Sequence, residues 1–310
     1  MSRYEHMSSF GGKPVVLYAS GMDVDPDSSY RIAWTWDNEG VPFGDVFAEF
    51  LASDQAAEVT ALVTGAYGEE MYEEPMSTVI EPLVAAARQL PSLTDLFIGD
   101  IISEENEISW IQQSDISPVL SAFPRLRTLG VRGSNGLTFG NIVHDQLRTL
   151  IVETGGLGRS VIAEIAEAKL PELQHLEIWT GSEDYGSDST IADIRPFFDR
   201  VLFPKLKTLA IRNSEYADQL PALAADSVVL RQLDVLDFSM GAMSDEGANQ
   251  LLAQKEKFAS LKKLDLSENM LSAKKVAELK SMPCPVVLDR QREGWVGRDG
   301  TVHRYPAVGE

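Results

Sequence analysis

The chain has 310 residues, 44% of them hydrophobic, so it is long enough to bury a large core. Its formal net charge of −20 repels phosphate backbones and disfavours nucleic-acid binding. The single cysteine, Cys284, excludes an internal disulfide framework, and no apolar run reaches the roughly 18 residues of a membrane span. Because residues 1–14 also hold no apolar signal segment, we expect a cytoplasmic monomer with no membrane contact.

The first 57 residues are predicted to form an N-terminal cap. Segments 14–18 and 30–36 have the apolar character of strands. Residues 44–56 place Val46, Phe47 and Phe50 on one side of a helix. A cap of this kind shields the core that the first unit of a stacked array would otherwise expose.

One apolar pattern then recurs along the chain: an apolar residue, two others, an apolar residue, one other, and a third apolar residue. Successive copies begin 33, 21, 26, 33, 27 and 28 residues apart. A degenerate copy occupies residues 59–64. The seven full copies begin at Leu93, Leu126, Leu147, Leu173, Leu206, Leu233 and Leu261.

The pattern resembles the leucine-rich repeat, whose consensus is L-x-x-L-x-L-x-x-N, and the copy at Leu261 also has Asn269 at the asparagine position. Alternate residues of a strand face opposite sides, so the last two apolar residues of each copy, at its fourth and sixth positions, point inward. We therefore predict an α/β leucine-rich-repeat solenoid of the ribonuclease-inhibitor-like horseshoe type. Its parallel strands would form the concave face and its helices the convex face, with atypical caps at both ends.

The segments between the copies are predicted to be helices. Residues 244–257 begin with Ser244 and acidic residues and end with lysines, in the order that the helix dipole favours. No Pro/Gly/Ser-rich linker separates a second domain, so residues 1–310 are expected to form one elongated domain with its repeats at 58–284. The other predicted helices are 76–90, 115–122, 158–170, 190–202, 216–226 and 272–281.

The C-terminal cap, residues 285–310, is predicted to contain a last strand at 286–288 and a hairpin over 295–305 that turns at Asp299-Gly300. Elsewhere, residues 154–160 form a glycine-rich turn before a helix. Such a turn could present backbone N–H groups to a phosphate, but its glycines lack dinucleotide-binding spacing, so a tight strand-to-helix turn is favoured.

Candidate binding residues follow from the repeat frame, because the position between the last two apolar residues and the position after them face outward. Phe97 and Gly130 are among these outward positions. We expect an exposed Trp179, flanked by Glu153 and Arg212, to be the centre of a binding surface, since tryptophan and arginine are enriched at binding hot spots. The candidates are Arg132, Glu153, Glu177, Trp179, Arg212, Asn213, Asp237 and Asp265.

Three acidic insertions, at 65–74, 100–113 and 181–189, are expected on the edge where strands pass to helices. Such an acidic edge would attract a basic partner. Within it, residues 108–111 are too apolar for a free loop, so Trp110 and Ile111 should pack on the solenoid or on a partner. The residues assigned to this edge are Glu104, Glu105, Trp110, Glu183 and Asp184.

Five segments resemble a bacterial family of cytoplasmic leucine-rich-repeat proteins of unestablished activity: 99–120, 130–137, 183–194, 209–218 and 304–310. The resemblance spans most of the chain, and it implies genes near radical-SAM-like and ATP-grasp-like genes, hence a partner or substrate-presenting role. It transfers no catalytic residue. The resemblance favours a functional role for the residues that lie in the recognised segments: Glu104, Glu105, Trp110, Arg132, Arg212 and Asn213.

The sequence thus favours a non-catalytic scaffold that binds a protein or a peptide. A basic partner is one possibility. No catalytic motif and no cofactor motif is found, and no metal-ligand spacing occurs among the histidines. The alternative is an enzyme or metal-dependent component that modifies a small molecule or peptide at the acidic edge.

Overall fold

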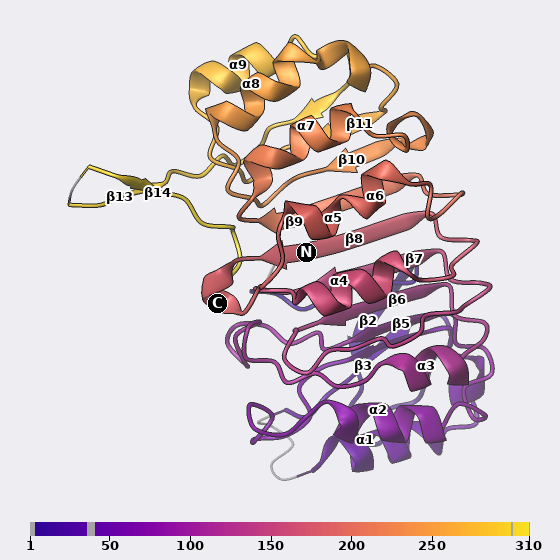
Figure 1. The fold of residues 1–310 in the computed structure, drawn as a ribbon. Helices are drawn as coiled ribbons and strands as arrows, with labels where there is room; N and C mark the ends of the chain where they lie inside the picture. Colours follow the sequence, from indigo (N-terminus) through magenta and orange to yellow (C-terminus); the bar gives the residue numbers. More distant parts are fainter. Residues whose placement is uncertain (1–3, 36–40, 299, 310) are drawn as a thin grey trace. The chain divides into compact units, whose positions relative to one another are not determined.

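The computed structural model describes residues 4–35, 41–298 and 300–309. Its contacts divide the chain into two compact units. The first unit comprises residues 1–153, 168–171 and 310, and the second comprises residues 154–167 and 172–309. Each unit stacks parallel strands on one side, here called the strand face, and helices on the other (Figure 1). The expected single elongated domain stays a prediction.

Among the described residues of the first unit, seven strands lie in chain order, and every pair after the antiparallel β1–β2 pair is parallel. The leucines of the repeat align in register from strand to strand and are at most 1% exposed, because they point between the sheet and the helices. The elements are β1 (Ser9–Phe10), β2 (Lys13–Leu17), β3 (Ser29–Ile32), α1 (Phe43–Leu51), η1 (Ala56–Glu58), β4 (Ala61–Thr64), α2 (Ser77–Ala85), β5 (Asp95–Ile98), α3 (Ser117–Ala122), β6 (Thr128–Arg132) and β7 (Thr149–Glu153).

The second unit repeats this arrangement with five parallel strands and adds a two-stranded arm. Its inward leucines, among them Leu176 and Leu209, are fully buried. The elements are α4 (Arg159–Ala166), β8 (His175–Gly181), η2 (Glu183–Tyr185), α5 (Ile191–Ile194), α6 (Pro196–Asp199), β9 (Thr208–Ser214), η3 (Ala217–Gln219), α7 (Leu220–Ala225), η4 (Leu230–Gln232), β10 (Val235–Asp237), α8 (Asp245–Ala253), η5 (Lys255–Phe258), β11 (Lys263–Asp265), α9 (Ala273–Leu279), β12 (Val286–Val287), β13 (Trp295–Val296) and β14 (Val302–His303).

These elements confirm the leucine-rich-repeat fold, and they correct several helix lengths. The helix predicted over 190–202 is divided into α5 and α6, because Pro196 has no backbone N–H to continue the first helix. Ser244 is the N-cap of α8, as predicted, and its side chain accepts a hydrogen bond from the N–H of Glu246. The helix predicted over 158–170 is shorter, since α4 begins after Gly158 and ends at Ala166.

Asn269 occupies the asparagine position of its repeat and is completely buried. Its side-chain amide donates to the carbonyls of Phe238 (2.8 Å) and Leu266 (3.1 Å), and its oxygen accepts from the N–H of Met243 (3.1 Å). One side chain therefore satisfies backbone groups that no strand or helix pairs, and it links two successive repeats.

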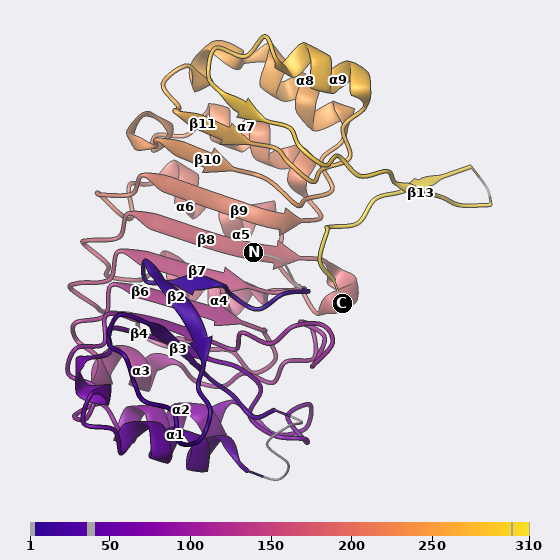
Figure 2. The same cartoon turned by 180° about the vertical axis from the view of Figure 1, so that it is seen from behind.

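The N-terminal segment packs across the strand face of the first unit, in addition to extending its sheet. Met7 and Phe10 cover Phe97, which is fully buried. Figure 2 shows this face, with the N-terminal strands in front. Strand register confirms that Phe97 points outward, as predicted. Its expected exposure is wrong, because the N-terminal segment covers it.

The C-terminal segment contains the predicted hairpin, whose strands are β13 and β14. Of the predicted turn pair, Asp299 lies outside the described residues, and Gly300 has a left-handed backbone. The predicted last repeat strand is β12, which pairs in parallel with β11.

Candidate functional site

Five of the predicted binding residues come together on the strand face of the second unit. We call Glu177, Trp179, Arg212, Asp237 and Asp265 the strand-face cluster. They lie on four adjacent strands, and strand register aligns Trp179 with Arg212 and Asp237 with Asp265. The repeat pattern alone placed them on one face, and the structure confirms that placement.

The expected exposure of Trp179 is wrong, because this side chain is only 2% exposed. Its indole N–H donates to Oε1 of Glu177 at 2.7 Å, and the guanidinium of Arg212 lies over its ring, 5.3 Å from the centroid. Trp179 therefore organises Glu177 and Arg212 beside it and offers almost no surface of its own to a partner.

Glu177 is the most strongly bound carboxylate of the strand-face cluster. Its Oε1 lies 2.6 Å from Nη1 of Arg212, and its Oε2 lies 3.3 Å from Nε2 of His175. Burial alone would raise the pKa of Glu177, but the hydrogen bond with His175, the charge of Arg212 and the Trp179 N–H together lower it to about 2. Glu177 is thus ionised and already paired.

Asp237 and Asp265 form the acidic side of the cluster. Burial raises the pKa of Asp237, and the charge of Asp265 adds to this effect while Arg212 opposes it. Asp265 pairs with Lys263 at 3.3 Å, and both carboxylates remain partly accessible. This part of the strand face is where an additional cationic group would be most favourable.

Asn213 does not belong to an accessible surface, since it is completely buried. Its amide donates to the carbonyls of Thr154 (3.2 Å) and Val308 (2.5 Å), and its oxygen accepts from the N–H of Val308 (2.8 Å). The prediction of a binding role therefore needs correction: this side chain attaches the C-terminal segment to β9.

Arg132 and Glu153 form a separate group in the first unit and are 3% and 1% exposed. Nε of Arg132 donates to Oε2 of Glu153 at 2.8 Å, and its Nη1 lies 3.5 Å from Oδ1 of the fully buried Asp100. Oδ2 of Asp100 in turn forms an ion pair with Nε of Arg31 at 3.4 Å. Arg132 and Glu153 are therefore buried and paired within the chain. The predicted exposure of these two residues to a ligand is wrong.

His6 joins the N-terminal segment to this buried group. Its Nδ1 lies 3.4 Å from Asp100, and its Nε2 lies 3.4 Å from Glu105. Burial alone would lower the pKa of His6, but the hydrogen bonds to these two carboxylates outweigh it and raise the pKa to about 9. No local sequence pattern predicts this arrangement, because His6 lies 94 positions before Asp100 and 99 positions before Glu105.

The acidic edge of the first unit contains a cavity of about 470 Å³ between its two insertions. We call it the acidic pocket. Glu69 and Tyr72 from one insertion and Glu104 from the other are exposed at it, whereas Trp34 is largely buried. Glu105 also lines the pocket, but Nη2 of Arg31 binds its carboxylate at 3.0 Å. The residues that line it are Trp34, Thr35, Gly68, Glu69, Met71, Tyr72, Glu104 and Glu105.

The other residues assigned to the edge lie outside this pocket. Trp110 is 60% exposed, while Ile111 is buried against the repeats as expected. Glu183 and Asp184 are exposed at η2 in the second unit. The glycine-rich segment before α4 forms a tight strand-to-helix turn. There Asp188 accepts from the backbone N–H of Arg159 at 2.6 Å, so the helix start already has an anionic partner.

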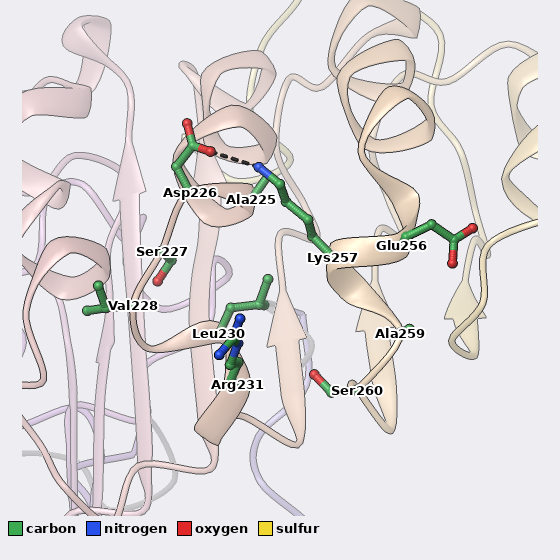
Figure 3. A pocket seen from close by; sticks show the side chains of 10 residues that line it. All are labelled: Ala225, Asp226, Ser227, Val228, Leu230, Arg231, Glu256, Lys257, Ala259 and Ser260. Carbon is green, nitrogen blue, oxygen red and sulfur yellow. Dashed lines mark hydrogen bonds and ion pairs between the residues drawn. The ribbon is translucent and has the colours of Figure 1, made fainter.

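A larger cavity of about 930 Å³ lies on the second unit, where α7 and η4 face η5 (Figure 3). An ion pair between Asp226 and Lys257 crosses it at 2.9 Å. Arg231 and Glu256 add one more charge of each sign. This lining has no charge excess that would select a ligand, and none of the predicted site residues belongs to it.

Comparison with solved structures gives the family. A crystal structure of a Bacteroides fragilis protein matches with a TM-score of 0.80 and 34% sequence identity, over 85% of this chain and 74% of that one. The chain belongs to the same family as this protein. A Listeria monocytogenes internalin also matches, with a TM-score of 0.36 and 15% identity over 74% of this chain and 67% of that one, which is too weak to support any argument. No family model and no curated protein matches the chain.

Among the residues that the structure describes, no group of three or more His, Cys, Asp or Glu side chains is arranged to hold a metal ion. None of the helices in the same part of the chain has the length and apolar character of a membrane span.

Proposed function

We propose that the chain is a non-catalytic scaffold that binds a basic peptide or protein segment at the acidic pocket. The observation that carries this proposal is the convergence of two insertions, from separate repeats, on one cavity. Loops extended on one face of a repeat array often form its binding face. The leucine-rich-repeat fold supports the same class of function, because it offers a rigid support for such loops.

The chemistry of the acidic pocket suits a lysine or arginine side chain. Glu69 and Glu104 provide two exposed carboxylates, and neither has an ion-pair partner among the described residues. The ring of Tyr72 is 52% exposed and offers a surface for a cation–π contact. A volume of about 470 Å³ accommodates one or two side chains.

The strand-face cluster is proposed as a second contact for the same kind of partner. Asp237 and Asp265 would provide its carboxylates, because Arg212 lies closer to Glu177 (2.6 Å) than to Asp237 (3.7 Å) and both aspartates keep 13% of their side-chain surface exposed. The resemblance to a family encoded near radical-SAM-like genes adds a role in presenting a peptide to modifying enzymes. We propose the cytoplasm as the compartment, because a chain with a single cysteine has no internal disulfide of the kind common in secreted proteins.

The test is a binding titration with two fluorescently labelled peptides of equal length, one rich in arginine and lysine and the other with glutamine at the same positions. We expect the basic peptide to bind more tightly, with an affinity that falls as salt rises. The double variant Glu69→Lys/Glu104→Lys should weaken binding at least tenfold.

Glu81→Lys is the matched control, because Glu81 is an exposed residue on α2 that does not line the acidic pocket. Glu105 is left unchanged, since its reversal would disturb Arg31 and His6. If the pocket variant bound the basic peptide as tightly as the control variant, the acidic pocket would not be the site.

A further inference from the structure

The acidic pocket has a third carboxylate, which is already bound within the chain. Glu105 lines the pocket next to Glu104, and its side chain keeps 20% of its surface exposed. Glu69 and Glu104 have no ion-pair partner among the described residues, whereas Glu105 has two. The negative charge that the pocket offers to a ligand therefore depends on how Glu105 is held.

Three donors hold the carboxylate of Glu105, and none of them belongs to the lining of the pocket. Nη2 of Arg31 lies 3.0 Å from Oε1 and 3.2 Å from Oε2. The backbone N–H of Ile102 donates to Oε2 at 3.2 Å, and Nε2 of His6 lies 3.4 Å from Oε1. Arg31 is on β3 and Ile102 is in the same insertion as Glu105. His6 is the one donor of the three that comes from the N-terminal segment.

The charges around His6 balance only when its imidazole is protonated. The charged groups that are connected to it are Asp100, Glu105, Glu153, Arg31 and Arg132. Burial alone would lower the pKa of His6, but the hydrogen bonds to Asp100 and Glu105 raise it to about 9. Without the charge of His6, three carboxylates face two guanidinium groups, and the negative excess lies on the two carboxylates that His6 contacts.

Contacts of the N-terminal segment fix the position of His6. The backbone N–H of Met7 donates to Oδ2 of Asp100 at 3.2 Å. Phe10 packs edge-on against Phe97, with the ring centroids 6.2 Å apart. The segment therefore carries one positive charge to a carboxylate of the acidic pocket.

We infer that the N-terminal segment restrains the acidic pocket, because His6 holds the carboxylate of Glu105 and so weakens the binding of a cationic side chain. The inference rests on the proposed function, since it concerns the regulation of the same pocket. With His6 charged and in place, a ligand cation meets only Glu69 and Glu104 as carboxylates without an ion-pair partner among the described residues. Without that charge, Arg31 no longer balances Glu105, and the pocket attracts a cation more strongly. His6 acts through Glu105 and is a positioning residue.

The test is a binding titration of the full chain with an arginine-rich peptide and its glutamine counterpart. At pH 7 and 50 mM NaCl, His6→Gln should bind the arginine peptide roughly three- to tenfold more tightly than the parent, and 500 mM NaCl should reduce this gain. His6→Lys keeps the positive charge and should bind like the parent. A damaged fold would weaken binding, so it cannot produce the expected gain.

A second set of variants shows whether the gain passes through Glu105. Glu105→Gln removes the carboxylate that His6 holds, so adding His6→Gln to it should give no further gain. Arg148→Gln is the matched control, because Arg148 is an exposed cation of the first unit that does not line the acidic pocket. Its affinity should stay within about twofold of the parent value, since the charge that it removes is screened by salt.

The affinity of the parent should also depend on pH. As pH rises from 7 to 10, through the pKa of His6 at about 9, the parent should approach the affinity of His6→Gln. Arginine keeps its charge over this range, so the peptide side chains do not titrate. His6→Gln retains every other titratable group of the parent, and its own pH profile therefore measures their contribution.

Equal or weaker binding of the arginine peptide by His6→Gln overturns the inference, and so does a gain that persists when Glu105 is already glutamine. If the parent still prefers the arginine peptide to the glutamine peptide in that case, the proposed function stands. If no variant distinguishes the two peptides, both fail.

Discussion

The guanidinium of Arg212 and the carboxylate of Glu177 meet on adjacent strands, with Nη1 and Oε1 2.6 Å apart. The positions are 35 residues apart in the chain, and only the stacking of repeats brings them together. Trp179 contributes to both, since its N–H donates to Glu177 and its ring lies beneath Arg212. The three side chains form one connected polar group on the strand face of the second unit.

Arg212→Ala should lower the free energy of unfolding by about 2–4 kcal/mol, because it leaves the carboxylate of Glu177 buried without its cation. The double variant with Glu177→Gln should lose less than the sum of the two single changes. Urea unfolding of the four proteins measures this coupling. Strict additivity would show that the ion pair contributes nothing.

The same carboxylate predicts how stability depends on acid. The pKa of Glu177 is about 2 in the folded chain and about 4.5 when unfolded, so its contribution is complete above pH 4.5. That contribution is lost as pH falls from 4.5 towards 2. Glu177→Gln should therefore show a smaller loss of stability than the parent in this window, and an equal loss would contradict the assignment.

His6 predicts the opposite dependence at high pH. Its pKa is raised to about 9 from 6.5, so the stabilisation by Asp100 and Glu105 is complete below pH 6.5 and is lost as pH rises through 9. Because the imidazole is partly exposed, we expect a loss of only about 1–2 kcal/mol. Urea unfolding at pH 6 and pH 9.5 should show this loss in the parent and not in His6→Gln.

Asn269→Ala should lower the free energy of unfolding by about 2–4 kcal/mol, because it leaves several buried backbone groups without partners. Asn269→Asp keeps an acceptor for the N–H of Met243 but removes every hydrogen bond that the side-chain amide donates, so it should also destabilise. Gln89→Ala, at an exposed site, should change stability by less than about 0.5 kcal/mol. Equal midpoints for the Asn269 and Gln89 variants would refute the role of the asparagine.

Gly130→Ala tests the packing of the strand face in the first unit. A Cβ atom at this position would overlap the ring of Phe97, which Met7 and Phe10 hold from above. We expect a loss of about 1–3 kcal/mol. Adding Phe97→Leu should recover part of that loss, and thermal unfolding of the single and double variants measures it. A double variant that is less stable than the sum of its parts would show that the ring is not the obstacle.

The sequence predicted the repeat fold and the register of its strands, because both depend on local apolar spacing that recurs. It also predicted which residues share the strand face, and Asp237 and Asp265 are aligned as expected. Exposure was not predictable in the same way. Trp179 and Phe97 point away from the leucine core, and yet both are buried.

The errors have a common physical cause. A repeat pattern states which side of a strand a residue occupies, but it does not state what lies against that side. The N-terminal segment that covers Phe97 and the C-terminal segment that binds Asn213 are not repeats, so no periodicity places them. The acidic pocket was predicted as an edge of charged loops, while the contribution of Trp34 had no sequence signal.

The contact between Met7 and Asp100 has a consequence for synthesis of the chain. The backbone N–H of Met7 donates to a carboxylate 93 positions later. Met7 leaves the ribosome before Asp100 and cannot make this contact until the 93 positions that follow it have been synthesised. Each repeat between Met7 and Asp100 can pack on its neighbour as it is synthesised. The segment around Met7 therefore reaches its native position only after the strand face that it covers has formed.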